Sequence, residues 1–152
     1  MKKQTAATKS IQNRRARFDY ELGDSFVVGI VLNGRETKAL RLGHGQLRGA
    51  YVTVKDNELW LINAAIMSTN NIKLTEQEQT QNRKLLAKRK EINEVIQAKQ
   101  QGMTIVPLEL LTRSRYIKLR IAIGRGKKKY DKREAIKKRD EDRNKQTELK
   151  HR

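Results

Sequence analysis

Few residues of this sequence have the type and spacing that enzymatic chemistry requires. The segment 124–127 contains two glycines and a lysine, but it lacks the spacing and the Ser or Thr of a phosphate-binding P-loop. His44 lies in a glycine-flanked turn and His151 lies near the end of the chain, so no histidine pair serves acid–base or metal chemistry. The absence of cysteine excludes thiol catalysis and Cys-ligated zinc. We therefore expect no catalytic activity, no metal and no cofactor.

Basic residues dominate the charge of the chain. Its 152 residues include 35 lysines and arginines against 17 aspartates and glutamates, a formal net charge of +18 at pH 7. Such a charge predicts an anionic partner: a nucleic acid, a ribosome or an acidic membrane. No apolar run approaches the roughly 20 residues of a membrane helix, and the basic first ten residues lack the apolar run of a secretory signal. We expect a cytoplasmic protein without a membrane partner.

Two residues have side chains suited to specific RNA contacts. Lysines and arginines give affinity for phosphates, but specificity needs base contacts or stacking. Glu36 stands among basic residues; a surface ion pair is the favoured interpretation, and acceptance of hydrogen bonds from a nucleobase is the alternative. Tyr130 stands in a basic segment without apolar neighbours, which favours stacking on a base, whereas Tyr51 and Trp60 lie in strand patterns that favour core packing.

The elements that would position these residues divide the chain into three regions. We expect a basic arm at 1–12, a folded RNA-binding domain at 13–124 and a basic tail at 125–152. Apolar and alternating patterns in the middle region predict strands at 25–32, 51–56, 58–62, 104–111 and 116–123. Asp56 and Asn57 predict a hairpin turn, and Pro107 places its strand at an edge or beside a bulge.

A helix is also expected in the folded domain. Apolar residues recur at helical spacing over 80–101, and Gly102 is a natural helix stop. Short strands with interspersed helix predict an α+β, mainly β fold: a small antiparallel barrel with flanking helices. The OB-fold is one such barrel, although periodicity alone does not establish its topology.

The tail is almost wholly charged. Asp131 and Glu134 have the spacing of a capping box, so a helix is predicted to start there. A helix that is polar on all sides has no face to bury and is marginal in water. We expect the tail to be disordered when free and helical against an anionic wall.

Five segments resemble motifs of the SmpB (SsrA-binding protein) family and occur in the family's order. They are NRRARFDY at 13–20, GRETKALRLG at 34–43, RKLL at 83–86, TIVPL at 104–108 and GKKKYDKR at 126–133. The family's RKLL motif implies a helix start. Phe18 stands where the family usually has histidine.

The resemblance implies an OB-like barrel and an RNA-binding role in trans-translation. The family binds the tRNA-like domain of tmRNA and accompanies it, with elongation factor Tu, to stalled ribosomes. Its tail lies in the empty mRNA channel at the decoding centre, against small-subunit rRNA. A basic ribosomal or ribosome-assembly protein without tmRNA selectivity is the alternative.

The resemblance also implies two sets of site residues, and it moves the interpretation of Glu36 toward a direct RNA contact. The implied tmRNA-binding residues are Asn13, Arg14, Arg15, Glu36, Lys38, Arg41, Arg83 and Lys84. The implied ribosome-binding tail residues are Gly126, Lys127, Lys128, Tyr130, Asp131, Lys132, Arg133 and Ile136. Tyr130 would stack on a decoding-centre base, and Ile136 would be an apolar anchor.

Overall fold

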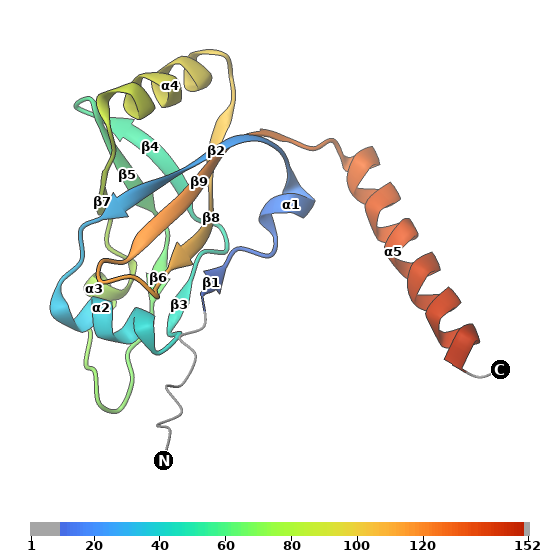
Figure 1. Ribbon diagram of the computed structural model, residues 1–152, viewed down its shortest axis with the longest axis horizontal. Helices are drawn as coiled ribbons and strands as arrows, with labels where there is room; N and C mark the ends of the chain where they lie inside the picture. Colours follow the sequence, from blue (N-terminus) through green and yellow to red (C-terminus); the bar gives the residue numbers. More distant parts are fainter. Residues whose placement is uncertain (1–9, 151–152) are drawn as a thin grey trace.

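The computed structural model describes residues 10–150, without the side chains of 129–131. Figure 1 shows a barrel from which a long C-terminal helix extends. The elements in chain order are β1 (Ile11–Gln12), α1 (Ala16–Asp19), β2 (Tyr20–Ile30), α2 (Gly34–Arg41), β3 (Gly45–Gln46), β4 (Tyr51–Lys55), β5 (Glu58–Ile62), β6 (Ala65–Ile66), α3 (Glu76–Thr80), β7 (Arg83–Leu86), α4 (Arg89–Gln100), β8 (Thr104–Leu111), β9 (Lys118–Gly126) and α5 (Lys129–Lys150).

The main sheet closes on itself. Its strands follow the order β1-β8-β4-β5-β7-β2-β9, and β8 also pairs with β9. Six antiparallel strands therefore form a closed barrel, with β1 attached to the edge of β8 that also pairs with β4. β3 and β6 form a separate two-stranded sheet. The expected antiparallel barrel with flanking helices is confirmed.

Both ends of the barrel are covered by helix. Alternate residues of the strands face inward, and Leu119 and Ile121 of β9 are fully buried. At one end α4 contributes the buried Val95. At the other end α2 contributes Ala39 and Leu40, so the apolar core is continuous from helix to helix (Figure 1).

Local sequence signals placed the hairpin and the bulge correctly. Asp56 and Asn57 join β4 to β5 with φ of 53° and 60°, and a two-residue turn with two positive φ angles matches the twist of a hairpin. The register between β8 and β9 shifts between Pro107 and Glu109. The predicted bulge is thus confirmed, because proline lacks the N–H that a regular ladder would use.

The predicted helix over 80–101 is wrong in its first third. Residues 83–86 form β7, and α4 begins only at Arg89. Leu85 lies opposite Leu59 of β5 on one side and Ile30 of β2 on the other, so this short strand closes the barrel. The backbone N–H of Lys88 donates to the Glu91 carboxylate and marks the true helix start. Long-range pairing therefore overrides helical spacing, and the helix start implied by the RKLL motif is also wrong.

Three other boundaries differ from the expectation. β9 runs over Lys118–Gly126 instead of 116–123. β2 begins at Tyr20 instead of residue 25, and only Val28 and Ile30 are buried, so the apolar run at 25–32 is a half-exposed strand. α5 begins at Lys129, two residues before Asp131. The capping contact expected of Asp131 falls among the side chains outside the described part of the structure. Residues 34–41, for which the sequence predicted no element, form α2.

A buried ion pair connects α2 to β7. Glu36 and Arg83 are 2% and 3% exposed. The Arg83 Nε donates to Glu36 Oε2 at 2.9 Å, and the Gln81 side-chain amide donates to Glu36 Oε1 at 2.9 Å. The Glu36 backbone N–H donates to the Asn33 side chain at 2.8 Å, which caps α2 and fixes the position of the carboxylate.

The remaining N–H groups of Arg83 donate to backbone carbonyls. Nη1 donates to Ala64 at 3.1 Å and to Gln81 at 2.9 Å, and Nη2 donates to Glu78 at 2.7 Å and to Gln79 at 3.3 Å. These bonds offset the desolvation of the guanidinium. They also tie β7 to α3 and to the segment before β6.

Replacing Arg83 with alanine should lower the free energy of unfolding by about 3–5 kcal/mol, because the Glu36 carboxylate would stay buried without its partner. Urea unfolding followed by the fluorescence of Trp60, the single tryptophan, measures this loss. Lys84→Ala is the matched control in the same strand: its ion pair with Glu58 is 39% and 45% exposed and should contribute less than about 1 kcal/mol. Equal losses in the two variants would contradict the structural role of the buried pair.

Candidate nucleic-acid interface

Residues 13–15 connect β1 to α1, and from here on we use the term arm for this segment, which is anchored to the barrel at Asn13. Its side-chain amide donates to the Pro107 carbonyl at 2.9 Å, and its backbone N–H donates to the Leu108 carbonyl at 2.8 Å. Asn13 is thereby half-buried against the bulge of β8, while Arg14 and Arg15 beside it are exposed. The bond between the Asn13 amide and the β8 bulge therefore fixes the backbone position from which Arg14 and Arg15 extend.

Arg41 holds a loop of the protein. Its guanidinium donates to the carbonyls of Thr112 at 2.8 Å, Ser114 at 3.0 Å and Arg115 at 2.7 Å. The side chain therefore positions the connection between β8 and β9. Lys38, one turn earlier in α2, is exposed.

Glu36 and Arg83 lie in the protein interior, contrary to both interpretations of Glu36 from the sequence. The pair is not a surface ion pair, and its buried oxygens and N–H groups are occupied by protein partners. In this conformation neither side chain reaches a nucleic acid. Lys84, which follows Arg83 in β7, is on the outside and pairs with Glu58 at 3.0 Å.

Two hollows on the surface each bring several exposed basic residues together. The first, which we name the arm–tail crevice, has a volume of about 540 Å³ and brings Arg14 and Arg15 together with Arg48 and with Arg139 of α5. The second, of about 680 Å³, lies at the start of α2 and brings Lys38 together with Arg35 and Lys73. The sequence did not identify Arg48, Arg139, Arg35 or Lys73, because no local motif shows which distant side chains meet.

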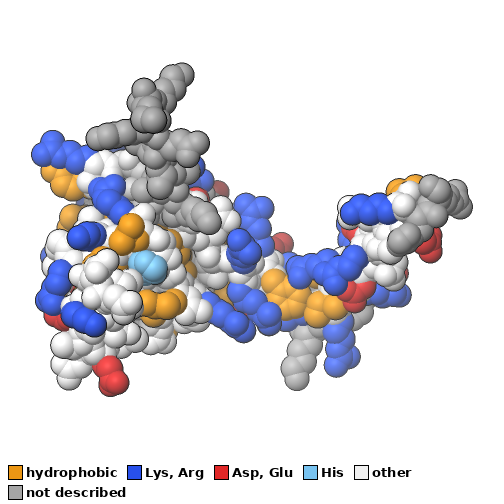
Figure 2. All heavy atoms as spheres, turned by 90° about the horizontal axis from the view of Figure 1, so that it is seen from below, with side chains coloured by type: hydrophobic (Ala, Val, Ile, Leu, Met, Phe, Trp, Pro, Cys, Tyr) orange, Lys and Arg blue, Asp and Glu red, His pale blue; other side chains and the backbone are white. Residues whose placement is uncertain are grey.

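The aromatic side chains are more exposed than the strand patterns indicate. Core packing was wrong for Tyr51, which is 41% exposed and lines a hollow of about 370 Å³ with Tyr20 and Arg48. Trp60 is half-buried. Figure 2 shows lysine and arginine side chains spread over the barrel and along the junction with the tail, interspersed with hydrophobic side chains.

The tail leaves the barrel from the end of β9. Gly126 is its last strand residue, and the Lys127 backbone N–H donates to the Asp19 carbonyl at 2.9 Å. The Lys132 Nζ pairs with Asp19 Oδ1 at 3.3 Å. Ile136 is 46% exposed. These contacts fix the base of α5 on α1.

Other predicted tail residues make fewer visible contacts. Lys128 and Arg133 are exposed. The side chains of Tyr130 and Asp131, for which stacking and capping were predicted, lie outside the described residues. Beyond its base, α5 is exposed to solvent along its length, and lysine, arginine and acidic residues alternate on all its sides.

Two further chemistries find no support in the described part of the chain. Within residues 10–150, no helix combines the length and the apolar character needed to cross a membrane. Among the side chains that the structure describes, which exclude those of 129–131, no three His, Asp or Glu residues gather as ligands for a metal ion. The surface features that the described structure does offer are basic hollows, exposed aromatics and a charged helix.

Comparison with known proteins agrees with these features over nearly the whole chain. The family model described as SmpB protein matches residues 10–151. SsrA-binding proteins of a Chelativorans species and of Paracoccus denitrificans are 44% and 45% identical to it, covering 92% and 91% of this chain and 92% and 90% of theirs. An SsrA-binding protein of a Nostoc species is 41% identical over 91% of both chains.

The fold is also similar to that of a solved structure. A chain from work described as "tmRNA-SmpB: a journey to the center of the bacterial ribosome" superposes with a TM-score of 0.64 at 33% identity. The match covers 84% of this chain and 94% of that one. The same barrel, approached by a basic arm and continued by a basic tail, thus accounts for the sequence motifs, and the chain belongs to the SmpB family of SsrA-binding proteins.

Proposed function

We propose that this protein binds the tRNA-like domain of tmRNA and delivers it to stalled ribosomes in trans-translation. The barrel and the arm bind the RNA, and α5 enters the empty mRNA channel and contacts small-subunit rRNA at the decoding centre. Elongation factor Tu takes part through the alanyl-tmRNA. The protein acts by binding, without catalysis, in the cytoplasm. The observation that carries this proposal is the family match over residues 10–151, which includes both the barrel and the tail.

The exposed basic residues of the barrel support the RNA-binding part. Arg14, Arg15, Lys38 and Lys84 direct their charges to solvent or to solvent-open ion pairs, so they are free to neutralise phosphates. Release of counterions from those phosphates supplies affinity, and the fixed shape of the surface supplies selectivity for a folded RNA.

The other four residues of the predicted RNA-binding set act indirectly in this proposal. Asn13 and Arg41 hold the arm and the β8–β9 connection through backbone carbonyls. Glu36 and Arg83 hold α2 against β7. They support the surface that binds the RNA without contacting the RNA themselves, so their replacement should weaken binding only under conditions in which that surface unfolds.

The shape and charge of α5 support the ribosomal part. Its 22 residues span about 33 Å at 1.5 Å per residue, enough to follow a channel wall. An exposed helix with little apolar surface contributes no stability to the barrel, whereas a wall of phosphates would stabilise it. In this role the tail would use Gly126, Lys127, Lys128, Tyr130, Asp131, Lys132, Arg133 and Ile136.

Truncation after Lys128 should separate the two activities. Binding of the tRNA-like domain should weaken less than about tenfold, because the truncation removes roughly one phosphate contact. Peptide tagging on stalled ribosomes should be lost completely. Filter binding and a tagging assay in a purified translation system measure the two outcomes. A truncated protein that still tags would contradict the proposed function of the tail.

Glu36→Gln should discriminate a positioning role from direct RNA contact. The variant should unfold at lower urea concentration, because the buried Arg83 would lose its ionic partner. At a temperature where circular dichroism shows it folded, its affinity for the tRNA-like domain should equal that of the wild type. A direct base contact would instead lower the affinity of the folded variant by about 1–3 kcal/mol.

A further inference from the structure

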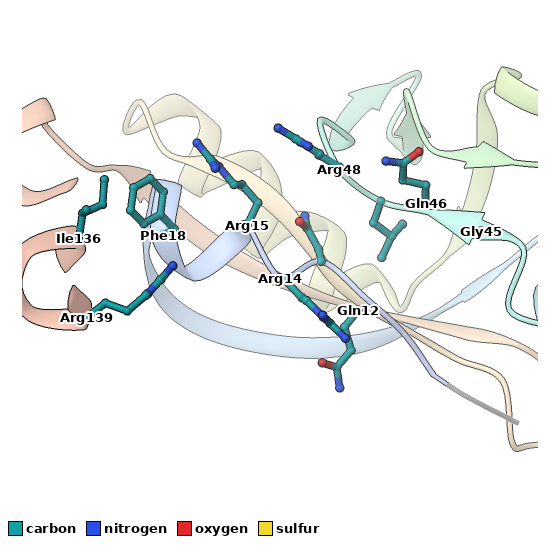
Figure 3. A pocket seen from close by; sticks show the side chains of 11 residues that line it. Gln12, Arg14, Arg15, Phe18, Gly45, Gln46, Arg48, Ile136 and Arg139 are labelled. Carbon is teal, nitrogen blue, oxygen red and sulfur yellow. The ribbon is translucent and has the colours of Figure 1, made fainter. Parts of the chain in front are cut away.

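Phe18 joins the tail to the barrel. Its half-buried ring lies 4.8 Å from the Arg15 guanidinium and 6.0 Å from the Arg139 guanidinium, measured to the ring centroid. Figure 3 shows Phe18 between Ile136 and Arg139 of α5 on one side and Arg15 on the other. Aromatic faces attract cations, so the ring attracts both Arg15, which precedes α1, and Arg139 of α5.

Asp19 reinforces the same junction. Its carboxylate lies 3.5 Å from the Arg15 Nε and 3.3 Å from the Lys132 Nζ. The first three turns of α5 therefore rest on α1 through one aromatic ring and one carboxylate. This footing is small and partly exposed, so it limits the direction of the helix only weakly.

Beside this junction, the arm–tail crevice concentrates positive charge. Four guanidiniums line it: those of Arg14 and Arg15 from the arm, Arg48 from the β3–β4 connection and Arg139 from α5. Among the side chains that the structure describes, Arg15 is the only one of the four with a carboxylate oxygen within 4 Å. The four arginines are exposed and carry the same charge, so an anion between them would replace their mutual repulsion with attraction.

The crevice fits the phosphates of an RNA strand. Its volume of about 540 Å³ is larger than a single phosphate group fills, and it opens to solvent. Gln12 and Gln46 line the crevice with the arginines (Figure 3), and their side-chain amides add neutral hydrogen-bonding groups. Planar guanidiniums with several donors are well suited to phosphate oxygens.

We propose that RNA phosphates bound in the arm–tail crevice bridge the arm to Arg139 and thereby fix the direction of α5. The identity of the anion as RNA rests on the proposed function. A single occupied crevice then couples two events: RNA bound to the barrel sets the orientation in which the tail is presented to the ribosome. Phe18 suits this device, because a neutral ring attracts both arginines while a protonated histidine would repel them.

Spin labels can measure the coupling directly. The chain has no cysteine, so Lys90→Cys on α4 and Gln146→Cys on α5 give a single labelled pair far from the crevice. Binding of the tRNA-like domain should narrow the distance distribution between the labels. In Arg139→Ala the distribution should stay broad with RNA bound, and the slope of log affinity against log salt should fall by about one.

Arg143→Ala is the matched control, since it removes the same charge from an exposed position one turn further along α5 and outside the crevice. This variant should keep the RNA-induced narrowing of the distance distribution, and its slope of log affinity against log salt should equal that of the wild type. If Arg139→Ala and Arg143→Ala lowered this slope equally, the proposal would be overturned. RNA would then be attracted by the overall charge of α5 and not by the crevice. An unchanged slope in Arg139→Ala would overturn it as well.

Two further probes separate this proposal from the proposed function. The first probe is a short oligouridine, an RNA that carries none of the features of tmRNA. If Arg139→Ala lowers the slope of log affinity against log salt for this RNA, the crevice binds phosphates even if the protein does not prefer tmRNA. Loss of that preference alone would overturn only the rescue function. Inorganic phosphate should not narrow the distribution at concentrations that leave RNA bound. Narrowing by phosphate alone would overturn the assignment of the crevice to an RNA strand.

Discussion

The buried ion pair between Glu36 and Arg83 is the constraint on which the rest of the molecule depends. Removing two charges from water is costly, and the structure compensates with a complete set of hydrogen bonds to Gln81 and to four backbone carbonyls. Those bonds hold α2, α3 and β7 in one arrangement. Because β7 links β5 to β2, the same arrangement closes the barrel.

The polar residues of the family motifs fall into two groups, those that bond to the protein backbone and those that are exposed. Asn13 and Arg41 use their donors on backbone carbonyls, as Arg83 does, and so shape the surface. Arg14, Arg15 and Lys38 remain exposed on elements that these residues hold in place. A rigid frame with exposed charges at its rim suits recognition of a folded RNA, whose phosphates lie at fixed distances from one another.

The sequence predicted correctly those features that depend on the conformational preferences of neighbouring residues. The hairpin at Asp56 and Asn57 and the bulge at Pro107 follow from backbone preferences of the residues themselves. The strand at 83–86 was missed because its apolar spacing also fits a helix, and only pairing with β2 and β5 decides the outcome. The burial of Glu36 and the meeting of Phe18 with Arg139 depend on residues far away in sequence, which a motif does not show.

Selectivity for one folded RNA is the central claim, and competition binding tests it most directly. The measurement is a titration of labelled tRNA-like domain of tmRNA with the full chain at physiological salt, in the presence of excess bulk tRNA. The account predicts tight binding that survives the competitor, because a net charge of +18 attracts every RNA but does not discriminate among them. Binding that bulk tRNA removes in proportion to its concentration would contradict the account and leave a general basic RNA-binding barrel.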